Sequence, residues 1–267
     1  MKERSLKKNQ WIELKKYADK LGISFFATVA FEDEVDFVKK LRCQSIKIAS
    51  ADVTHFPLID YAAKSNISIQ LDTGMSSIDE IKDAVNIIEK RKNKKIIIHH
   101  CPSGYPAKLD GVNLNIIKTL KKTFNYPIAF SDHSPGFLMD IVALGYGVNL
   151  LEKTITEDRT YPSVEHMMSL EPIEMKKFVK TIRDIELAKG KFIKKLSKSE
   201  IIKSRMIRRS PYLLNSTKKN TPLKNANVIF RRPGLGLTPA EYVKFSKYRF
   251  KTNKFKNSLI RRENLKK

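Results

Sequence analysis

The sequence predicts an α/β fold in which parallel strands alternate with helices. Six short β-rich runs are each followed by a stretch with helical apolar spacing, the pattern of parallel β/α units. Several of the runs end on polar residues, and the carboxyl ends of parallel strands form the active face of such folds. A closed (β/α)₈ barrel needs eight strands, so the spacing leaves an open doubly wound sheet and a barrel as alternatives. The strands are expected at 23–29, 46–50, 67–73, 95–101, 127–131 and 149–155.

Helices are expected between these strands, with one more at the N-terminal side of the first. Their apolar residues recur at the spacing of one helix face. Ser77 and Glu80 form a capping box at the start of one helix, and Gly22 is a stop signal for the first. The helices are expected at 9–21, 32–41, 57–64, 77–90, 114–124, 136–146 and 172–188.

The alternation of strands and helices ends near Gly190, which predicts a domain boundary. A β/α domain is expected at 1–190, a basic linker at 191–205 and a small β-containing domain at 206–267. Within the small domain the sequence predicts short strands, a Gly/Pro-rich loop and a short helix. These are placed at 211–214, 228–230, 231–239 and 240–245.

The composition narrows the class of protein. The chain has 267 residues and is 41% hydrophobic, enough to bury a sizeable core. No apolar run reaches the roughly 18 residues that a membrane span needs, and the N-terminal residues lack a signal-peptide pattern. Cys43 and Cys101 alone do not make a disulfide framework. We therefore expect a cytoplasmic protein with no membrane partner.

Positive charge is concentrated in the C-terminal part of the chain. The whole chain has a net charge of +24, and residues 191–267 carry 23 Lys and Arg against three Glu, a net of +20. A basic segment of this kind can bind nucleic acid or another acidic surface. Because the segment also shows ordinary folded patterning, a solvated Lys-rich surface is the favoured interpretation, and nucleic-acid binding is kept as the alternative.

Two residues at the expected strands carry the clearest chemical signals. Lys47 lies between Ile46 and Ile48 on an apolar strand. A buried Lys is costly unless it meets an anion, so a phosphate or carboxylate ligand is expected there. His133 follows a strand end and has the chemistry of a metal ligand or an acid–base group.

The other histidines give weaker signals. His99 and His100 are adjacent on a strand and point to opposite faces, so at most one of them lines a site, and packing is the expected role of each. His166 lies beside Glu165 in an expected loop. Ligand or substrate binding and a purely structural role are equally open for it.

Taken together, these segments resemble the sialic acid synthase family, whose bacterial members make N-acetylneuraminate and the related legionaminate and pseudaminate sugars. The resemblance runs from about Trp11 to the C-terminus. No single motif is specific, but their order and spacing together are. The matching stretches are 47–50, 68–75, 100–106, 131–133, 152–153, 169–172 and 232–236.

The resemblance implies a TIM-type (β/α) barrel followed by a small antifreeze-like (SAF) domain. It implies a transferase that condenses phosphoenolpyruvate with an N-acetylated amino sugar, N-acetylmannosamine or a diacetamido relative. The products are a nine-carbon 2-keto sugar acid and phosphate. Family members use a divalent metal, Mn²⁺ or Mg²⁺, and act as homodimers in which the small domain of one chain covers the barrel of the other.

Carried over by position, the resemblance assigns roles to individual residues. His133 would be a metal ligand, and Arg232 would reach the partner subunit's site and hold the acyl group of the sugar. Phosphoenolpyruvate would be contacted by Lys47, Thr28, Ser50, Ser103 and Ser131. The remaining catalytic residues would be Tyr105, between the two substrates, and Asp52 and Glu165, facing the sugar.

The sequence also departs from the family pattern. Two strands that come first in family members have no counterpart here, so the barrel is expected to lack its first two strands. Thr154 stands where the family has a second metal-binding His, which leaves His166 as the candidate substitute ligand. Asp52 replaces a Glu, and Asp72 replaces a Ser of the phosphate loop. A non-catalytic remnant or sugar-phosphate-binding relative therefore remains an alternative to an active synthase.

Overall fold

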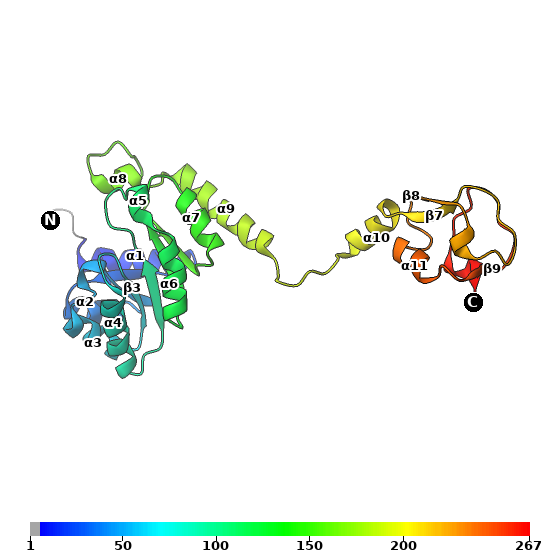
Figure 1. The fold of residues 1–267 in the computed structure, drawn as a ribbon. Coiled ribbons are helices and arrows are strands. Elements are labelled where there is room, and N and C mark those ends of the chain that lie inside the picture. The colour runs from blue at the N-terminus through cyan, green and yellow to red at the C-terminus, as the bar shows by residue number, and fades with distance from the viewer. Residues whose placement is uncertain (1–5) are drawn as a thin grey trace. The chain divides into compact units, whose positions relative to one another are not determined.

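The structure of the chain is a computed structural model that describes residues 6–267. The chain divides into two compact units, Met1–Lys189 and Gly190–Lys267 (Figure 1). Within residues 6–267, no helix is both long and apolar enough to cross a membrane.

A six-stranded parallel sheet forms the centre of the first unit (Figure 1). Every strand pairs in parallel with the next one in the sequence, so the order in the sheet is the order in the chain. A doubly wound sheet reverses its strand order at a switch point, so that alternative is wrong for these strands. Sequential order is instead the arrangement found in barrels. The strands are β1 (Phe26–Val29), β2 (Ser45–Ile48), β3 (Ser68–Asp72), β4 (Ile96–His100), β5 (Ile128–Asp132) and β6 (Leu150–Lys153).

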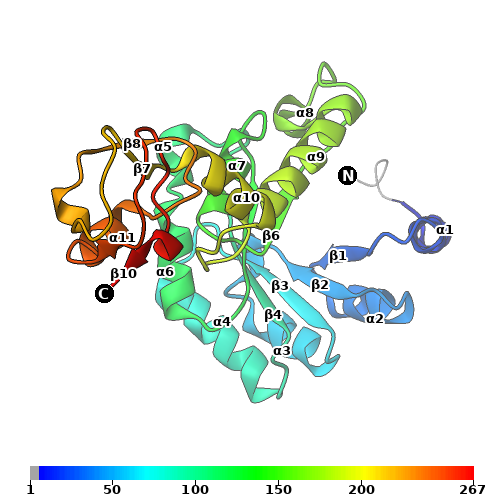
Figure 2. The ribbon, with the colours of Figure 1, turned by 90° about the vertical axis from the view of Figure 1, so that its right-hand side faces the viewer.

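The helices of the first unit follow the strands, as the apolar spacing predicts. Ser77 accepts a hydrogen bond from the Glu80 backbone N–H, which confirms the predicted capping box of α4. Figure 2 shows α2, α3 and α4 following one another along the sheet. The short helices α5 and α8 were not predicted. The helices are α1 (Lys8–Lys20), α2 (Glu32–Lys40), α3 (Phe56–Lys64), α4 (Ile78–Lys90), α5 (Leu109–Val112), α6 (Asn115–Thr123), α7 (Leu138–Gly145), α8 (Val164–Met168) and α9 (Pro172–Lys189).

The two faces of the sheet differ in chemistry because side chains alternate along each strand. One face carries Ile46, Ile48, Ile69, Leu71 and Phe130, all fully buried in a core with the helices. We call this the outer face. The residues between them point to the opposite, inner face. That face is polar, and the core on the outer face therefore fixes the positions of polar groups on the inner one.

The second unit contains two small antiparallel sheets, one of β7 and β8 and one of β9 and β10. Its core includes Leu213, Leu223, Phe250 and Leu265. The strands near 211–214 and 228–230 and the helix near 240–245 are confirmed. Its elements are α10 (Lys198–Ile207), β7 (Ser210–Leu213), β8 (Val228–Arg231), α11 (Pro239–Lys244), β9 (Arg249–Phe250) and β10 (Leu265–Lys266).

The stretch expected to be a basic linker, 191–205, differs in the structure. Most of its second half belongs to helix α10. The signal for this helix is a second capping box, in which Ser197 accepts from the Glu200 backbone N–H and the Glu200 carboxylate accepts from the Ser197 N–H. The helix start was not predicted because this Lys-rich stretch was interpreted as a linker.

Gly236 shows why the predicted Gly/Pro-rich loop of the second unit needs glycine. A Cβ at this position would meet the carbonyl oxygen of Ile260 and the side chain of Leu259. The Leu237 N–H donates to the same Ile260 carbonyl. The loop can therefore approach the C-terminal segment only where there is no side chain.

Candidate active site

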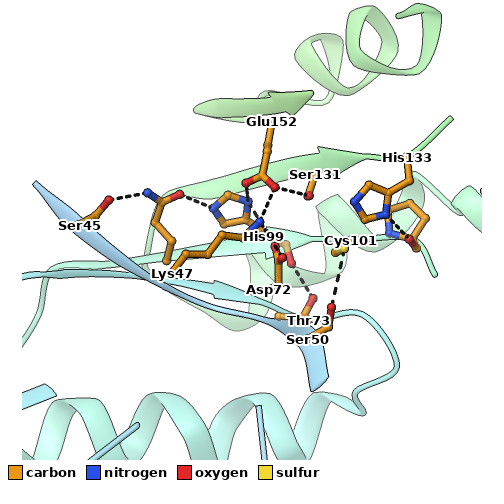
Figure 3. Close-up of polar contacts among 12 residues, drawn as sticks. Ser45, Lys47, Ser50, Asp72, Thr73, His99, Cys101, Ser131, His133 and Glu152 are labelled. Atoms are coloured by element: carbon orange, nitrogen blue, oxygen red, sulfur yellow. Dashed lines mark hydrogen bonds and ion pairs between the residues drawn. The ribbon is translucent and has the colours of Figure 1, made fainter. Parts of the chain in front are cut away.

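Polar side chains from neighbouring strands β2 to β6 meet on the inner face of the sheet (Figure 3). Each lies at a strand position of the same alternation, so the outer-face core holds them in one layer. They lie near the carboxyl ends of the strands, the active edge of parallel β/α folds. The set is Lys47 on β2, Gln70 and Asp72 on β3, His99 on β4, Ser131 on β5 and Glu152 on β6.

Lys47 is the centre of this set. Its ammonium lies 2.8 Å from Asp72 Oδ2 and also pairs with Glu152 Oε1. Lys47 is 7% exposed. Burial works against its charged form, but the facing carboxylates of Asp72 and Glu152 outweigh burial and raise its pKa. The sheet interior therefore holds a permanent cation at the place where the sequence predicts an anion ligand.

The two carboxylates respond differently to the same lysine. Burial raises the pKa of Asp72 to about 6, in spite of Lys47, and the charge of Glu152 adds to the rise. Burial also acts on Glu152, but Lys47, His99 and Ser131 outweigh it and lower its pKa. Ser131 Oγ donates to Glu152 Oε1 at 3.0 Å. Glu152 is thus the permanently charged partner, and Asp72 is the one that can take up a proton.

His99 lies between these carboxylates and is fully buried. Its Nε2 is 3.0 Å from Gln70 Oε1, and Gln70 Nε2 donates to Ser45 Oγ at 2.6 Å. Burial lowers the pKa of His99 to about 4, so the ring is neutral near pH 7. The chain of hydrogen bonds assigns the proton to Nε2, which leaves Nδ1 as an acceptor facing the carboxylates.

The structure brings several of the predicted substrate contacts to the same place. Thr28 on β1 is the register partner of Lys47. Ser131 reaches Lys47 through their shared partner Glu152. Ser50, in the 3₁₀ helix η2 (Ser50–Asp52), lies 3.9 Å from Cys101 Sγ (Figure 3). Burial raises the pKa of the Cys101 thiol to about 11, so it is neutral.

Tyr105 and His133 form a second group just beyond the carboxyl ends of β4 and β5. Their rings stack with centroids 4.5 Å apart, and His133 Nδ1 is 3.3 Å from the Pro102 carbonyl oxygen. Burial raises the pKa of Tyr105, and the negative charge of Glu165 acts in the same direction. Glu165, on helix α8, is therefore close enough to Tyr105 to act on it electrostatically.

The remaining predicted residues are half-buried or exposed. Asp52 is half-buried, and its Oδ1 is 3.9 Å from His55 Nδ1. Ser103 is exposed in the loop after β4. Arg232 is exposed and belongs to the second unit.

The two histidines predicted as metal ligands have separate partners. His166 Nδ1 is 2.7 Å from Thr156 Oγ1, whereas His133 faces Pro102. In residues 6–267 no three His, Cys, Asp or Glu side chains are arranged to hold a metal ion. Thr154 Oγ1, at the position of the family's second His, is buried with no hydrogen-bond partner. The described residues do not form a complete metal site.

Sequence reasoning did not select Glu152, Asp72 and His99 as site residues. Packing was the expected role of both His99 and His100. It is confirmed for His100, which bonds the Val112 carbonyl and stacks on Phe130, but His99 lies in the polar cluster. The available signal was the alternation of each strand. Residues that alternate with the outer-face apolar residues of a strand point inward, and Lys47, Asp72, His99 and Glu152 all satisfy that rule.

An ion pair on the outer face supports the strand ends. Lys153 Nζ lies 2.5 Å from Asp132 Oδ2 and also donates to the Ser134 carbonyl. Asp140 of helix α7 is 3.9 Å from the same ammonium, and all three side chains are at most 1% exposed. Burial raises the pKa of Asp140 to about 8, and the charge of Asp132 adds to the rise. Lys153 therefore ties β6 and α7 to the turn that carries His133.

Comparison with known proteins shows the family. The NeuB family model matches residues 1–194, and the chain belongs to the NeuB family. An N,N'-diacetyllegionaminic acid synthase of Legionella pneumophila is 33% identical over 232 residues, which cover 85% of this chain and 65% of that protein. Human N-acetylneuraminate-9-phosphate synthase is 34% identical over 194 residues, which cover 72% of this chain and 54% of the human one. This chain thus spans between half and two thirds of these two relatives.

The fold is also that of a solved relative. An N-acetylneuraminic acid synthetase of Leptospira borgpetersenii, crystallised in complex with citrate, superposes with a TM-score of 0.70 at 33% identity. The match covers 74% of this chain and 70% of that one. The α/β fold predicted from the alternation of strands and helices is confirmed. The nucleic-acid alternative gains no support from these relatives.

We predict that Lys153→Met lowers the free energy of unfolding of the first unit by about 3–5 kcal/mol, because it leaves the buried Asp132 carboxylate without its cation. Chemical denaturation followed by circular dichroism measures the change. Lys180→Met is the matched control, since Lys180 is exposed and pairs with the exposed Asp184 one helical turn away. A loss for Lys153→Met no larger than that of the control would contradict this role.

Proposed function

We propose that this chain is a sialic acid-type synthase. In this reaction phosphoenolpyruvate condenses with an N-acetylated amino sugar, N-acetylmannosamine or a diacetamido relative, to give a nine-carbon 2-keto sugar acid and phosphate. The observation that carries the proposal is the buried Lys47 ammonium at the active edge of a NeuB-family sheet. A fixed cation in a buried site is suited to hold the phosphate or carboxylate of phosphoenolpyruvate.

The chemistry divides between the two groups of residues. Lys47 and the hydroxyls of Thr28, Ser50 and Ser131 would hold phosphoenolpyruvate. Its enol carbon attacks the aldehyde carbon of the open-chain sugar and forms the new C–C bond. The aldehyde oxygen takes the electron pair of its C=O bond and a proton. Water then adds to the resulting cationic carbon and loses one proton. The C–O bond to phosphate breaks with its electron pair leaving on phosphate, and the second proton of the added water is lost as the 2-keto group forms.

The sugar would lie beyond the carboxyl ends of the strands. Tyr105 stacks on His133 there, and Glu165 acts on it electrostatically. In the proposal Tyr105 separates the two substrates, while Asp52 and Glu165 face the sugar and Ser103 contacts phosphoenolpyruvate from the loop after β4. The six-stranded sheet would correspond to six strands of a TIM-type barrel, and the second unit to a SAF-type domain.

We expect Lys47→Ala to lower kcat/KM for phosphoenolpyruvate by about 10²–10³-fold, because it removes the buried cation that meets the substrate anion. The assay is phosphate release with a panel of acetamido sugars. Lys82→Ala, an exposed lysine on α4 paired with Asp79, is the matched control and should keep full activity.

Lys47→Ala also leaves two carboxylates unpaired, so its folding is checked by circular dichroism, and Lys47→Arg is assayed beside it. The arginine keeps the charge and should retain part of the activity. Equal activity of Lys47→Ala and the unmodified chain would contradict the proposal. Absence of phosphate release from every sugar would favour the non-catalytic alternative.

We also expect the reaction to need a divalent metal, Mn²⁺ or Mg²⁺. Residues 6–267 do not supply three protein ligands to one point, so the ion would need further ligands from the substrates or water. Treatment with EDTA should abolish phosphate release, and added Mn²⁺ should restore it. Full activity after removal of all divalent ions would show that this prediction, which comes from the family resemblance, is wrong here.

We also propose a homodimer in which Arg232 completes the site of the partner subunit, and mixing two inactive variants tests it. If Arg232 completes the partner subunit's site, Lys47→Ala and Arg232→Ala should complement each other. Only the mixed dimer has one site with both residues intact, so the mixture should recover up to about a quarter of full activity. A mixture no more active than the average of its two components would contradict a shared site.

A further inference from the structure

The inner-face charges are unusual for a site that binds an anion. The one ammonium on this face, among the described residues, is already paired with two carboxylates, Asp72 and Glu152 (Figure 3). A phosphate-bearing substrate that reaches Lys47 would therefore meet two negative charges as well as one positive charge. At separations of a few ångströms in a poorly hydrated site, such repulsion is large. Something must relieve it when the anion binds.

Three polar atoms beside Lys47 show where this electrostatic repulsion could be reduced. Asp72 Oδ1, His99 Nδ1 and Glu152 Oε2 are buried and have no hydrogen-bond partner among the described residues. The ring nitrogen lies 3.6 Å from Asp72 Oδ1 and 3.7 Å from Glu152 Oε2. Because His99 carries its proton on Nε2, toward Gln70, all three facing atoms are acceptors. One proton placed among them would turn a repulsive contact into a hydrogen bond.

Asp72 is the group of this cluster that can bind that proton. The titratable groups that face it are Lys47 from β2, His99 from β4, Cys101 and Tyr105 after β4, and Glu152 from β6. The pKa of Cys101 is raised to about 11 and that of Tyr105 is raised, so both stay neutral. Lys47 and Glu152 stay charged, and His99 stays neutral. Asp72, with its pKa raised to about 6, changes charge nearest to neutrality.

We propose that Asp72 takes up one proton when a phosphate-class oxyanion binds Lys47, so that this site binds its anionic substrate together with a proton. The proton comes from solvent and forms an O–H bond on Asp72 Oδ1, which donates to His99 Nδ1. Lys47 stays an ammonium and moves its hydrogen bond from Asp72 Oδ2 to the anion. Asp72 and His99 thus act as positioning residues, and the inference rests on the proposed function because it concerns the same phosphate-bearing substrate.

The sign of the pH effect follows from this scheme. Above about pH 6 the free site has an ionised Asp72 and the occupied site a protonated one, so binding weakens as pH rises, by up to about tenfold per pH unit. Below that pH Asp72 is already protonated in the free site, and affinity becomes constant. Binding should therefore consume close to one proton per anion at pH 7.5 and close to none at pH 5.

The test is isothermal titration of the full chain with inorganic sulfate and with phosphoenolpyruvate, at constant ionic strength, from pH 5 to 8.5. Sulfate does not change its own charge in this range, so any pH dependence belongs to the protein. Repeating the titration in buffers of different ionisation enthalpy counts the protons taken up. Asp72→Asn keeps the shape of the side chain without its charge and should bind both anions more tightly at pH 8, with no proton uptake for sulfate. Asp79→Asn, an exposed carboxylate on α4, should behave as the unmodified chain.

The outcomes separate this inference from the function on which it rests. Sulfate binding by the unmodified chain with a flat pH profile and no proton uptake overturns the inference, whether or not Asp72→Asn folds. If phosphoenolpyruvate is still turned over in that case, the proposed function stands. If Lys47→Ala binds phosphoenolpyruvate as well as the unmodified chain, or if no variant binds either anion, the proposed anion site and this inference both fail.

Discussion

The ion pairs of Lys47 with Asp72 and Glu152 are the interaction on which the site depends. A lysine can be buried in the sheet interior only if its charge is compensated there. The compensation comes from strands β3 and β6, which are not neighbours of each other in the sheet. Lys47 on β2 meets Glu152 on β6 although three strands lie between them in the sheet. The sheet must therefore curl so that the inner faces of distant strands come together, and fold and site are linked through this one ammonium.

The outer face of the same strands serves a different purpose. Ile46 and Ile48 flank Lys47 in the sequence and are buried in the core with the helices. Their burial fixes the direction in which the Lys47 side chain points. Lys153 does the same by ion pairing, because its contacts with Asp132 and Asp140 hold β6 so that Glu152 faces inward. A one-residue slip of β6 would exchange the roles of Glu152 and Lys153 and remove both sets of contacts.

Much of this arrangement could be predicted from sequence, and what could not has physical reasons. The six strands were predicted within a few residues, since apolar runs and helix caps are local signals. The order of the strands in the sheet could not be predicted from these signals, because a doubly wound sheet and a barrel show the same alternation of strands and helices along the chain. Lys47 was selected because it interrupts an apolar strand, whereas His99 was assigned to packing because its partners are Asp72 and Glu152, which are distant in sequence. Helix α10 was missed because its capping box lies in a Lys-rich stretch.

The most direct measurement is a crystal structure of the chain with phosphoenolpyruvate bound near pH 6. We expect a phosphate or carboxylate oxygen of the ligand within hydrogen-bond distance of Lys47 Nζ, with the Asp72 carboxyl released from that ammonium and turned toward His99. A ligand bound elsewhere, with Lys47 still paired to both carboxylates, would contradict the assignment of this buried lysine as the anion site.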